Sequence, residues 1–131
     1  MNDKTRSIVL IVGALVLAAI FVMFGAGKFI DPAKWIAKFS AWGIPEWFVP
    51  VSGALELAGA AGLLIPVVRG LAGLGLALFM IGAVATHVVH AEIGMIFVAG
   101  AILAGCAAIA WFRLPETMDF FRKRIKGGRL D

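Results

Sequence analysis

The chain has a single cysteine, Cys106, and few charged residues. One cysteine excludes a disulfide framework and a Cys-x-x-Cys pair, so this chain alone cannot carry out dithiol redox chemistry. The two histidines, His87 and His90, lie three residues apart and would share one helix face, which excludes a haem held between two opposed histidines. Only 15% of the residues are charged. That share is too low for an ordinary soluble domain, in which about 25% is usual.

Apolar residues make up 62% of the chain and fall into four blocks. The blocks cover residues 8–27, 51–68, 71–90 and 93–112. Each is close to the roughly 20 residues that a helix needs to cross a hydrocarbon core about 30 Å thick. The blocks are apolar on all sides, whereas strands of a membrane barrel would alternate apolar and polar residues. We therefore predict one domain over residues 1–131 with an all-α fold, an integral membrane four-helix bundle.

A short additional helix is predicted between the first and second blocks. Asp31 followed by Pro32 is typical of a helix start, and Gly43 of a helix end, which bounds a helix at about residues 32–42. Aromatic residues recur along it at helical spacing, so it either lies in the membrane interface or covers the mouth of the bundle as a lid. The residues expected at this lid or interface are Trp35, Phe39, Trp42 and Trp47.

The basic residues are unevenly distributed between the two sides of the predicted bundle. Nine lysines and arginines lie before the first block, between the second and third, and after the fourth, against three in the first loop. The positive-inside rule then puts both termini in the cytoplasm, with residues 113–131 as a basic tail. Because this charge flanks the helices, no nucleic-acid partner is expected. The first block is longer than the usual apolar core of a signal peptide, so we expect it to be retained.

Ionisable residues gather toward the outer end of the predicted bundle. Glu56 stands among small residues of the second block, where close helix packing would turn it inward. A carboxylate inside a membrane helix costs about 2.5–3.5 kcal/mol, so Glu56 requires a partner or a task. Counting from the outer helix ends places His87 at a similar depth and Lys28 within reach. The candidates for binding a ligand or a proton are Glu56, His87, Lys28 and His90, and no catalytic residue is assigned.

Three functions are open for this group. In the first, a quinol headgroup hydrogen-bonds the carboxylate and the histidine during proton-coupled redox chemistry. In the second, Lys28, Glu56 and His87 form a packing network that ties helices together in a structural or assembly protein. The third is a small proton-coupled transporter, although small multidrug exporters carry their glutamate in the first helix. A metal site built on the two histidines and a glutamate, Glu92 or Glu56, is disfavoured because the motif is short, so no metal is predicted.

Three segments carry a resemblance to a known family. They are residues 24–32 (FGAGKFIDP), 41–45 (AWGIP) and 53–59 (GALELAG), followed by His87 late in the third block. Together they resemble the DoxX and DoxX-like family over about residues 8–112. The distinguishing pieces are Gly-x-x-Lys at the end of the first helix and Glu-Leu-x-Gly in the second.

The resemblance implies a four-helix membrane protein of bacteria, located in the inner membrane. The family is named after a subunit of a terminal quinol oxidase and of a thiosulfate:quinone oxidoreductase, and more distant relatives act as receptor-assembly chaperones. By this resemblance the chain is expected to be a small subunit, without catalytic activity of its own, in a quinone-linked electron-transfer complex. Its ligand would be quinone or quinol, and its partners the lipid bilayer and a redox subunit, with a homo-oligomer left open. Lys28, Glu56 and His87 would be the family's polar set.

Overall fold

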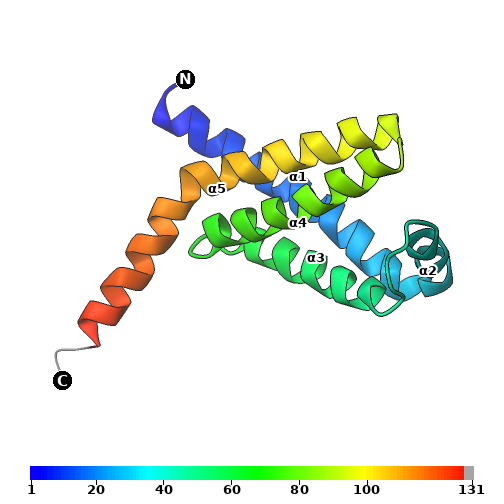
Figure 1. Cartoon of the computed structure of the whole chain (residues 1–131). Coiled ribbons are helices and arrows are strands. Elements are labelled where there is room, and N and C mark those ends of the chain that lie inside the picture. Colours follow the sequence, from blue (N-terminus) through cyan, green and yellow to red (C-terminus); the bar gives the residue numbers. More distant parts are fainter. Residues whose placement is uncertain (129–131) are drawn as a thin grey trace.

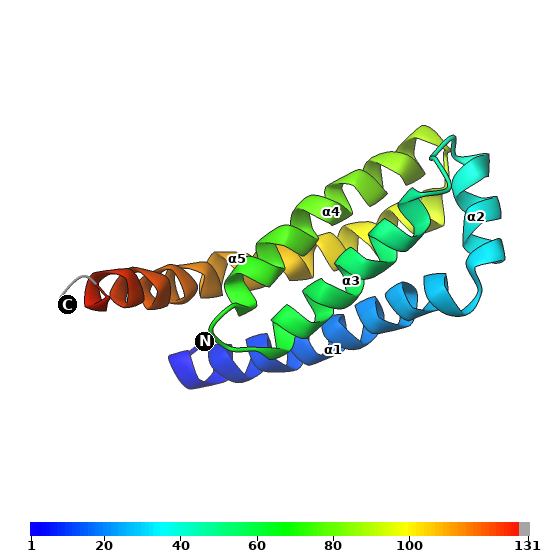
Figure 2. The same cartoon turned by 90° about the horizontal axis from the view of Figure 1, so that it is seen from below.

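The computed structural model describes residues 1–128, and these form five helices (Figure 1). The helices are α1 (Asp3–Ile30), α2 (Pro32–Ala41), α3 (Phe48–Leu64), α4 (Arg69–Val89) and α5 (Ile93–Gly127). Figure 2 shows α1, α3, α4 and α5 side by side with alternating directions, while α2 lies across one end. We call this the α2 end, and the opposite end, which holds the N-terminus and the α3–α4 turn, the terminal end. The predicted all-α bundle with a short extra helix is confirmed.

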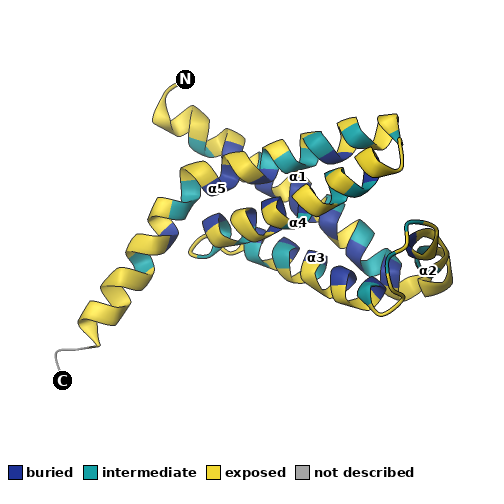
Figure 3. Ribbon diagram, in the orientation of Figure 1, coloured by how far each residue is buried: buried dark blue, intermediate teal, exposed yellow. Residues whose placement is uncertain are grey.

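Among the described helices, α1, α4 and α5 are long and apolar enough to cross a membrane. The fourth bundle helix, α3, is also apolar but has only 17 residues. The outward faces of the bundle are exposed (Figure 3) and carry large apolar side chains such as Val16, Leu78 and Phe97. Apolar residues facing outward on helices of this length are what a lipid-facing surface requires, because lipid offers no hydrogen bonds. The chain therefore forms a helical membrane bundle.

Two prolines explain why α3 differs from the predicted block at residues 51–68. The helix begins earlier, at Phe48, because Pro50 falls in its first turn, where a backbone N–H has no partner within the helix. It ends earlier, at Leu64, because Ile65 precedes Pro66 and takes an extended conformation with φ −96° and ψ 112°. Pro45 lies in the loop before α3. The shorter helix still packs along α1 and α4.

The helix predicted at residues 93–112 extends further along the chain than expected. Pro115 lies inside α5, and the helix continues through the basic segment to Gly127. A proline removes one backbone hydrogen bond and bends a helix without having to end it. Figure 1 shows α5 changing direction in this region, so that its final part leaves the bundle. Of the tail predicted at residues 113–131, residues 129–131 lie outside the part that the structure describes.

The bundle is built from two closely packed pairs, α1 with α3 and α4 with α5, which are joined through α3 and α4. Small residues allow the close contacts, as in other membrane bundles. A Cβ added to Gly59 of α3 would lie 2.4 Å from the side chain of Leu76 on α4. Apolar residues such as Phe21, Leu63 and Ile109 are buried between the helices.

Candidate functional site

The candidate site begins where α1 and α3 come closest. A Cβ on Gly25 would lie 2.9 Å from the carbonyl oxygen of Gly53, and one on Gly53 would lie 3.2 Å from the Cβ of Lys28. Such an approach is available only to residues without a side chain. Lys28 and Glu56 each follow one of these glycines by three residues, about one helical turn. The glycine contact therefore carries the lysine and the glutamate to the same point between the helices.

Lys28 and Glu56 form a buried ion pair. The Lys28 Nζ donates a hydrogen bond of 2.6 Å to Glu56 Oε2, and the two side chains are only 4% and 7% exposed. The ammonium also lies 4.4 Å from the ring centroid of Trp35 on α2. This cation–π contact contributes about 0.5–2 kcal/mol. The predicted pairing of the two residues is present, and it engages one carboxylate oxygen of Glu56 while the other, Oε1, is not part of this bond.

His87 pairs with Glu92 and not with Glu56. The His87 Nδ1 lies 2.5 Å from Glu92 Oε2, and Trp42 Nε1 donates a 3.2 Å hydrogen bond to Glu92 Oε1. The rings of Trp42 and His87 meet edge to face at 5.5 Å. Glu92 thus joins the end of α4 to the residue that follows α2, and this second group is separate from the ion pair of Lys28 and Glu56.

The partners of Glu92 also change its acidity. The hydrogen bond with His87, followed by that from Trp42, holds the pKa of Glu92 below its ordinary value of 4.5. Both contacts favour the charged carboxylate. The Glu92 side chain is 35% exposed, whereas that of His87 is 10% exposed. The carboxylate therefore connects a largely buried ring to the surface at the α2 end.

Glu92 was considered from the sequence only as a ligand of a disfavoured metal site, and its contact with His87 was not predicted. The tight turn explains its position, since Ala91 has a positive φ of 55° and the Glu92 N–H bonds to the carbonyl of His87 at 2.9 Å. This turn folds the acid back over the last turn of α4. The feature of the sequence that could have indicated this contact is an acidic residue at the end of a short turn, five positions after a histidine.

The ion pair and the ring of His87 border one cavity of about 420 Å³. Residues from all five described helices line it, and most are apolar. Its polar or charged lining residues are Lys28, Lys38, Glu56, Thr86 and His87. The cavity therefore combines a large apolar space with a few polar groups from different helices, which is the usual make-up of a small-molecule site.

The predicted lid residues separate into two groups. Trp35, Phe39 and Trp42 line the cavity, whereas Trp47 is 65% exposed and does not. Phe39 is buried and its ring lies 5.7 Å from that of Trp42. Helix α2 itself forms as predicted, because the Asp31 side chain caps the Lys34 N–H at 3.3 Å. The aromatic face of α2 thus covers one end of the cavity.

His90, the fourth candidate from the sequence, lies outside the cavity lining. Its Nδ1 is 2.8 Å from the carbonyl oxygen of Thr86, and the residue is exposed. Within residues 1–128, no three histidine, cysteine, aspartate or glutamate side chains are grouped closely enough to hold a metal ion. The polar side chains that line the cavity can donate or accept hydrogen bonds.

The site lies within a part of the chain that matches a known protein family. No curated protein and no solved structure matches the chain at a significant level. The model of the DoxX-like family, however, matches residues 12–110, which include the glycine contact, the ion pair, α2 and His87. The match covers well over half of the sequence, and the chain belongs to the DoxX-like family.

Proposed function

We propose that the protein is a small subunit of a quinone-linked electron-transfer complex in the bacterial inner membrane, with both termini in the cytoplasm. The observation that carries the proposal is the cavity of about 420 Å³, in which apolar and aromatic walls surround the buried pair and the ring of His87. The subunit binds the headgroup of a quinone or quinol in this cavity and does not act alone.

The residues present fit such a ligand. A volume of about 420 Å³ lies within the roughly 300–1,000 Å³ of small-molecule sites. Aromatic side chains of α2 supply flat apolar surfaces for a ring, while hydrogen-bonding groups lie on its border. His87 binds Glu92 through Nδ1, which leaves Nε2 for a ligand oxygen. Glu56 binds Lys28 through Oε2, which leaves Oε1 for a second oxygen of the ligand.

The arrangement also supplies a route for protons. Oxidation of a quinol releases two protons and two electrons, and the electrons would pass to a redox partner subunit. His87 accepts a proton at Nε2 and releases one from Nδ1 to Glu92, whose carboxylate orients the ring. Glu92 is partly exposed and can release that proton to water. Glu56 on α3 offers a second acceptor for a proton released by the ligand.

The test is to purify the protein from bacterial membranes in mild detergent and measure bound quinone by extraction and chromatography. We expect quinone in the wild type and its loss in Glu56→Gln and His87→Leu, with helical content unchanged. Glu46→Gln is the matched control, since Glu46 is exposed in the loop before α3. Failure to bind quinone either alone or together with copurified partners would overturn the proposal.

A purely structural or assembly role is the second candidate, and one observation favours it. Lys28 and Glu56 satisfy each other at 2.6 Å with both side chains buried, so the carboxylate already has the partner that its position demands. Under this alternative, the double variant Lys28→Met with Glu56→Leu keeps its stability and its partners. Quinone binding distinguishes the two roles, because only the first requires the charged pair to contact a ligand.

A further inference from the structure

The final part of α5 projects from the terminal end of the bundle (Figures 1 and 2). It begins near Pro115, where the missing backbone N–H allows a bend, and it remains helical to Gly127. The bundle helices leave most of this segment exposed. A helix this short is marginal in water unless something covers its apolar face, because most helical stability in proteins comes from packing.

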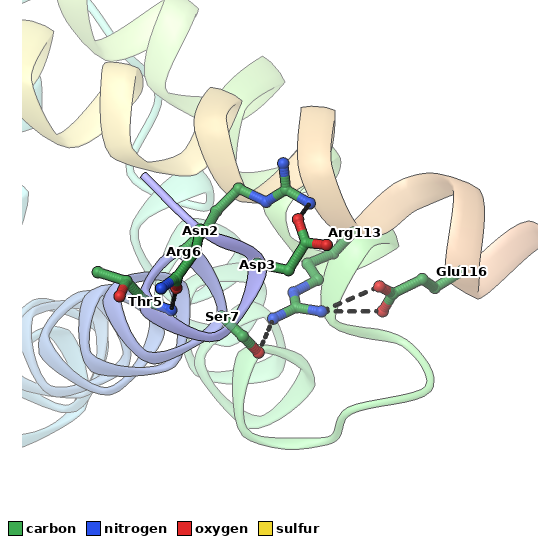
Figure 4. Close-up of polar contacts among 7 residues, drawn as sticks. All are labelled: Asn2, Asp3, Thr5, Arg6, Ser7, Arg113 and Glu116. Atoms are coloured by element: carbon green, nitrogen blue, oxygen red, sulfur yellow. Dashed lines mark hydrogen bonds and ion pairs between the residues drawn. The ribbon is translucent and has the colours of Figure 1, made fainter.

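Contacts at the base of this segment fix its direction. Arg113 donates through Nη2 to Ser7 Oγ on α1 at 2.8 Å, and through Nη1 to both carboxylate oxygens of Glu116 at 3.0 and 3.1 Å (Figure 4). On the other side, a Cβ added to Gly70 of α4 would lie 2.4 Å from the backbone N of Leu114. The segment is therefore held by α1 and α4 where it leaves the bundle.

One face of the segment is an apolar stripe. Met118, Phe121 and Ile125 recur at spacings of three and four, and all three are exposed. Trp111, seven residues before Met118, lies on the same face at the end of the apolar part of α5 and is 80% exposed. Because Trp111 belongs to the lipid-facing surface, the stripe continues that surface into the projecting segment.

The charges of the segment lie on its flanks and its opposite face. Lys123 and Glu116 lie opposite the stripe, while Arg122 and Arg124 flank it on either side, as a spacing of 100° per residue requires. Including Lys126 and Asp119, residues 116–127 hold four basic and two acidic side chains. Basic side chains beside an apolar stripe are typical of helices that lie in the interface of an anionic membrane.

We propose that residues 116–127 form an interfacial helix that lies on the bilayer surface at the terminal end and recognises anionic phospholipid headgroups. The apolar stripe enters the boundary between headgroups and acyl chains, and the flanking basic residues contact the lipid phosphates. The continuity of the stripe with Trp111 selects the bilayer over a soluble acidic partner, because the stripe meets lipid at its first residue. This inference does not depend on the identity of the ligand in the cavity.

The test uses the full chain reconstituted into vesicles, with Cys106→Ala and a single new cysteine at either Phe121→Cys on the stripe or Lys123→Cys on the polar side. The rate of reaction with a membrane-impermeant maleimide is measured in phosphatidylcholine vesicles with and without phosphatidylglycerol. In vesicles that contain phosphatidylglycerol, we expect position 121 to react several-fold more slowly than position 123. In vesicles that lack it, the two positions should react at similar rates. Changing Arg122, Arg124 and Lys126 to glutamine should remove that protection.

Three outcomes would overturn the proposal. Equal rates at the two positions in anionic vesicles would mean that the segment stays in water. Equal protection of position 121 with and without phosphatidylglycerol would mean that anionic headgroups are not recognised. Protection in detergent micelles that grows with protein concentration would mean that a second copy of the chain covers the stripe. Because Cys106 is buried, a parallel series that retains it checks that Cys106→Ala has not altered the fold.

Discussion

Gly25 and Gly53 bring the backbones of α1 and α3 into direct contact, and a Cβ at Gly25 would lie only 2.9 Å from the Gly53 carbonyl oxygen. The buried ion pair is a consequence of this contact, because the two charged residues follow the two glycines by the same number of positions. The Gly-x-x-Lys pattern and the glycine that precedes the glutamate therefore act together to position the ion pair.

Gly25→Ala should separate α1 from α3 and weaken the ion pair. The new methyl group would meet backbone and the side chain of Leu57, so we expect a loss of about 1–3 kcal/mol in unfolding free energy. Unfolding in detergent followed by circular dichroism measures it. Gly13→Ala on the same helix is the control, because nothing lies within 4 Å of that position, and it should be neutral or stabilising. Equal effects of the two substitutions would contradict the contact.

The pairing of Lys28 with Glu56 can be measured by a double-mutant cycle. Lys28→Met or Glu56→Leu alone leaves one buried charge without its partner, which should cost about 3–5 kcal/mol. The double variant removes both charges and should be close to the wild type in stability. Thermal and denaturant unfolding in the same detergent provide the four values. Additive losses in the double variant would show that the two residues act independently.

Glu92 should make the stability of the α2 end depend on pH. Its pKa is lowered in the folded protein, mainly by the hydrogen bond with His87 and then by that from Trp42. The stabilisation is therefore complete above the ordinary pKa of 4.5 and is lost as the pH falls through the lower folded value. Nearby His90 also favours the charged carboxylate.

The measurement compares unfolding of the wild type and Glu92→Gln between neutral pH and a pH below 4.5. The difference in unfolding free energy should be largest at neutral pH and should shrink on acidification. Glu46→Gln, an exposed change at the same end, should show no such trend. A difference that stays constant with pH would mean that the Glu92 charge does not hold the α2 end.

Cys106 should be unreactive in the folded protein. It is fully buried among core residues that include Leu17 and Ile109, so a thiol reagent has no access to it. We expect labelling with a maleimide only after denaturation, detected by mass spectrometry. The chain's single cysteine then reports unfolding of the bundle without any engineered label. Rapid labelling under native conditions would mean that α5 separates from α1 and α4.

The sequence allowed prediction of the architecture because hydrophobic block length and helix-capping residues are local signals. Asp31, Pro32 and Gly43 bound α2 as expected, since Asp31 caps the helix and Gly43 has a φ of 75°. The prolines were harder to interpret. Pro50 and Pro115 lie inside helices while Pro66 helps to end one, and the difference depends on the position of each proline within the turn.

Lys28 could be placed beside Glu56 from the sequence, because both lie on helices whose contact is marked by glycines. The partner of His87 could not be predicted in the same way. It depends on the backbone at Ala91, whose positive φ of 55° turns Glu92 back toward α4. Turn conformations of this kind are rarely readable from a non-glycine residue. The exclusion of His90 and Trp47 from the cavity depends on side-chain direction, which spacing alone does not determine.

The length of α3 has a consequence for the surrounding lipid. At 17 residues the helix rises about 25 Å, which is short of a hydrocarbon core about 30 Å thick. A short helix is accommodated by local thinning of the bilayer or by oligomerisation. Where the bilayer thins beside α3, both layers of headgroups come closer to Glu56, which lies midway along this helix. The quinone that we propose as a ligand would then reach the cavity from a thinned part of the bilayer.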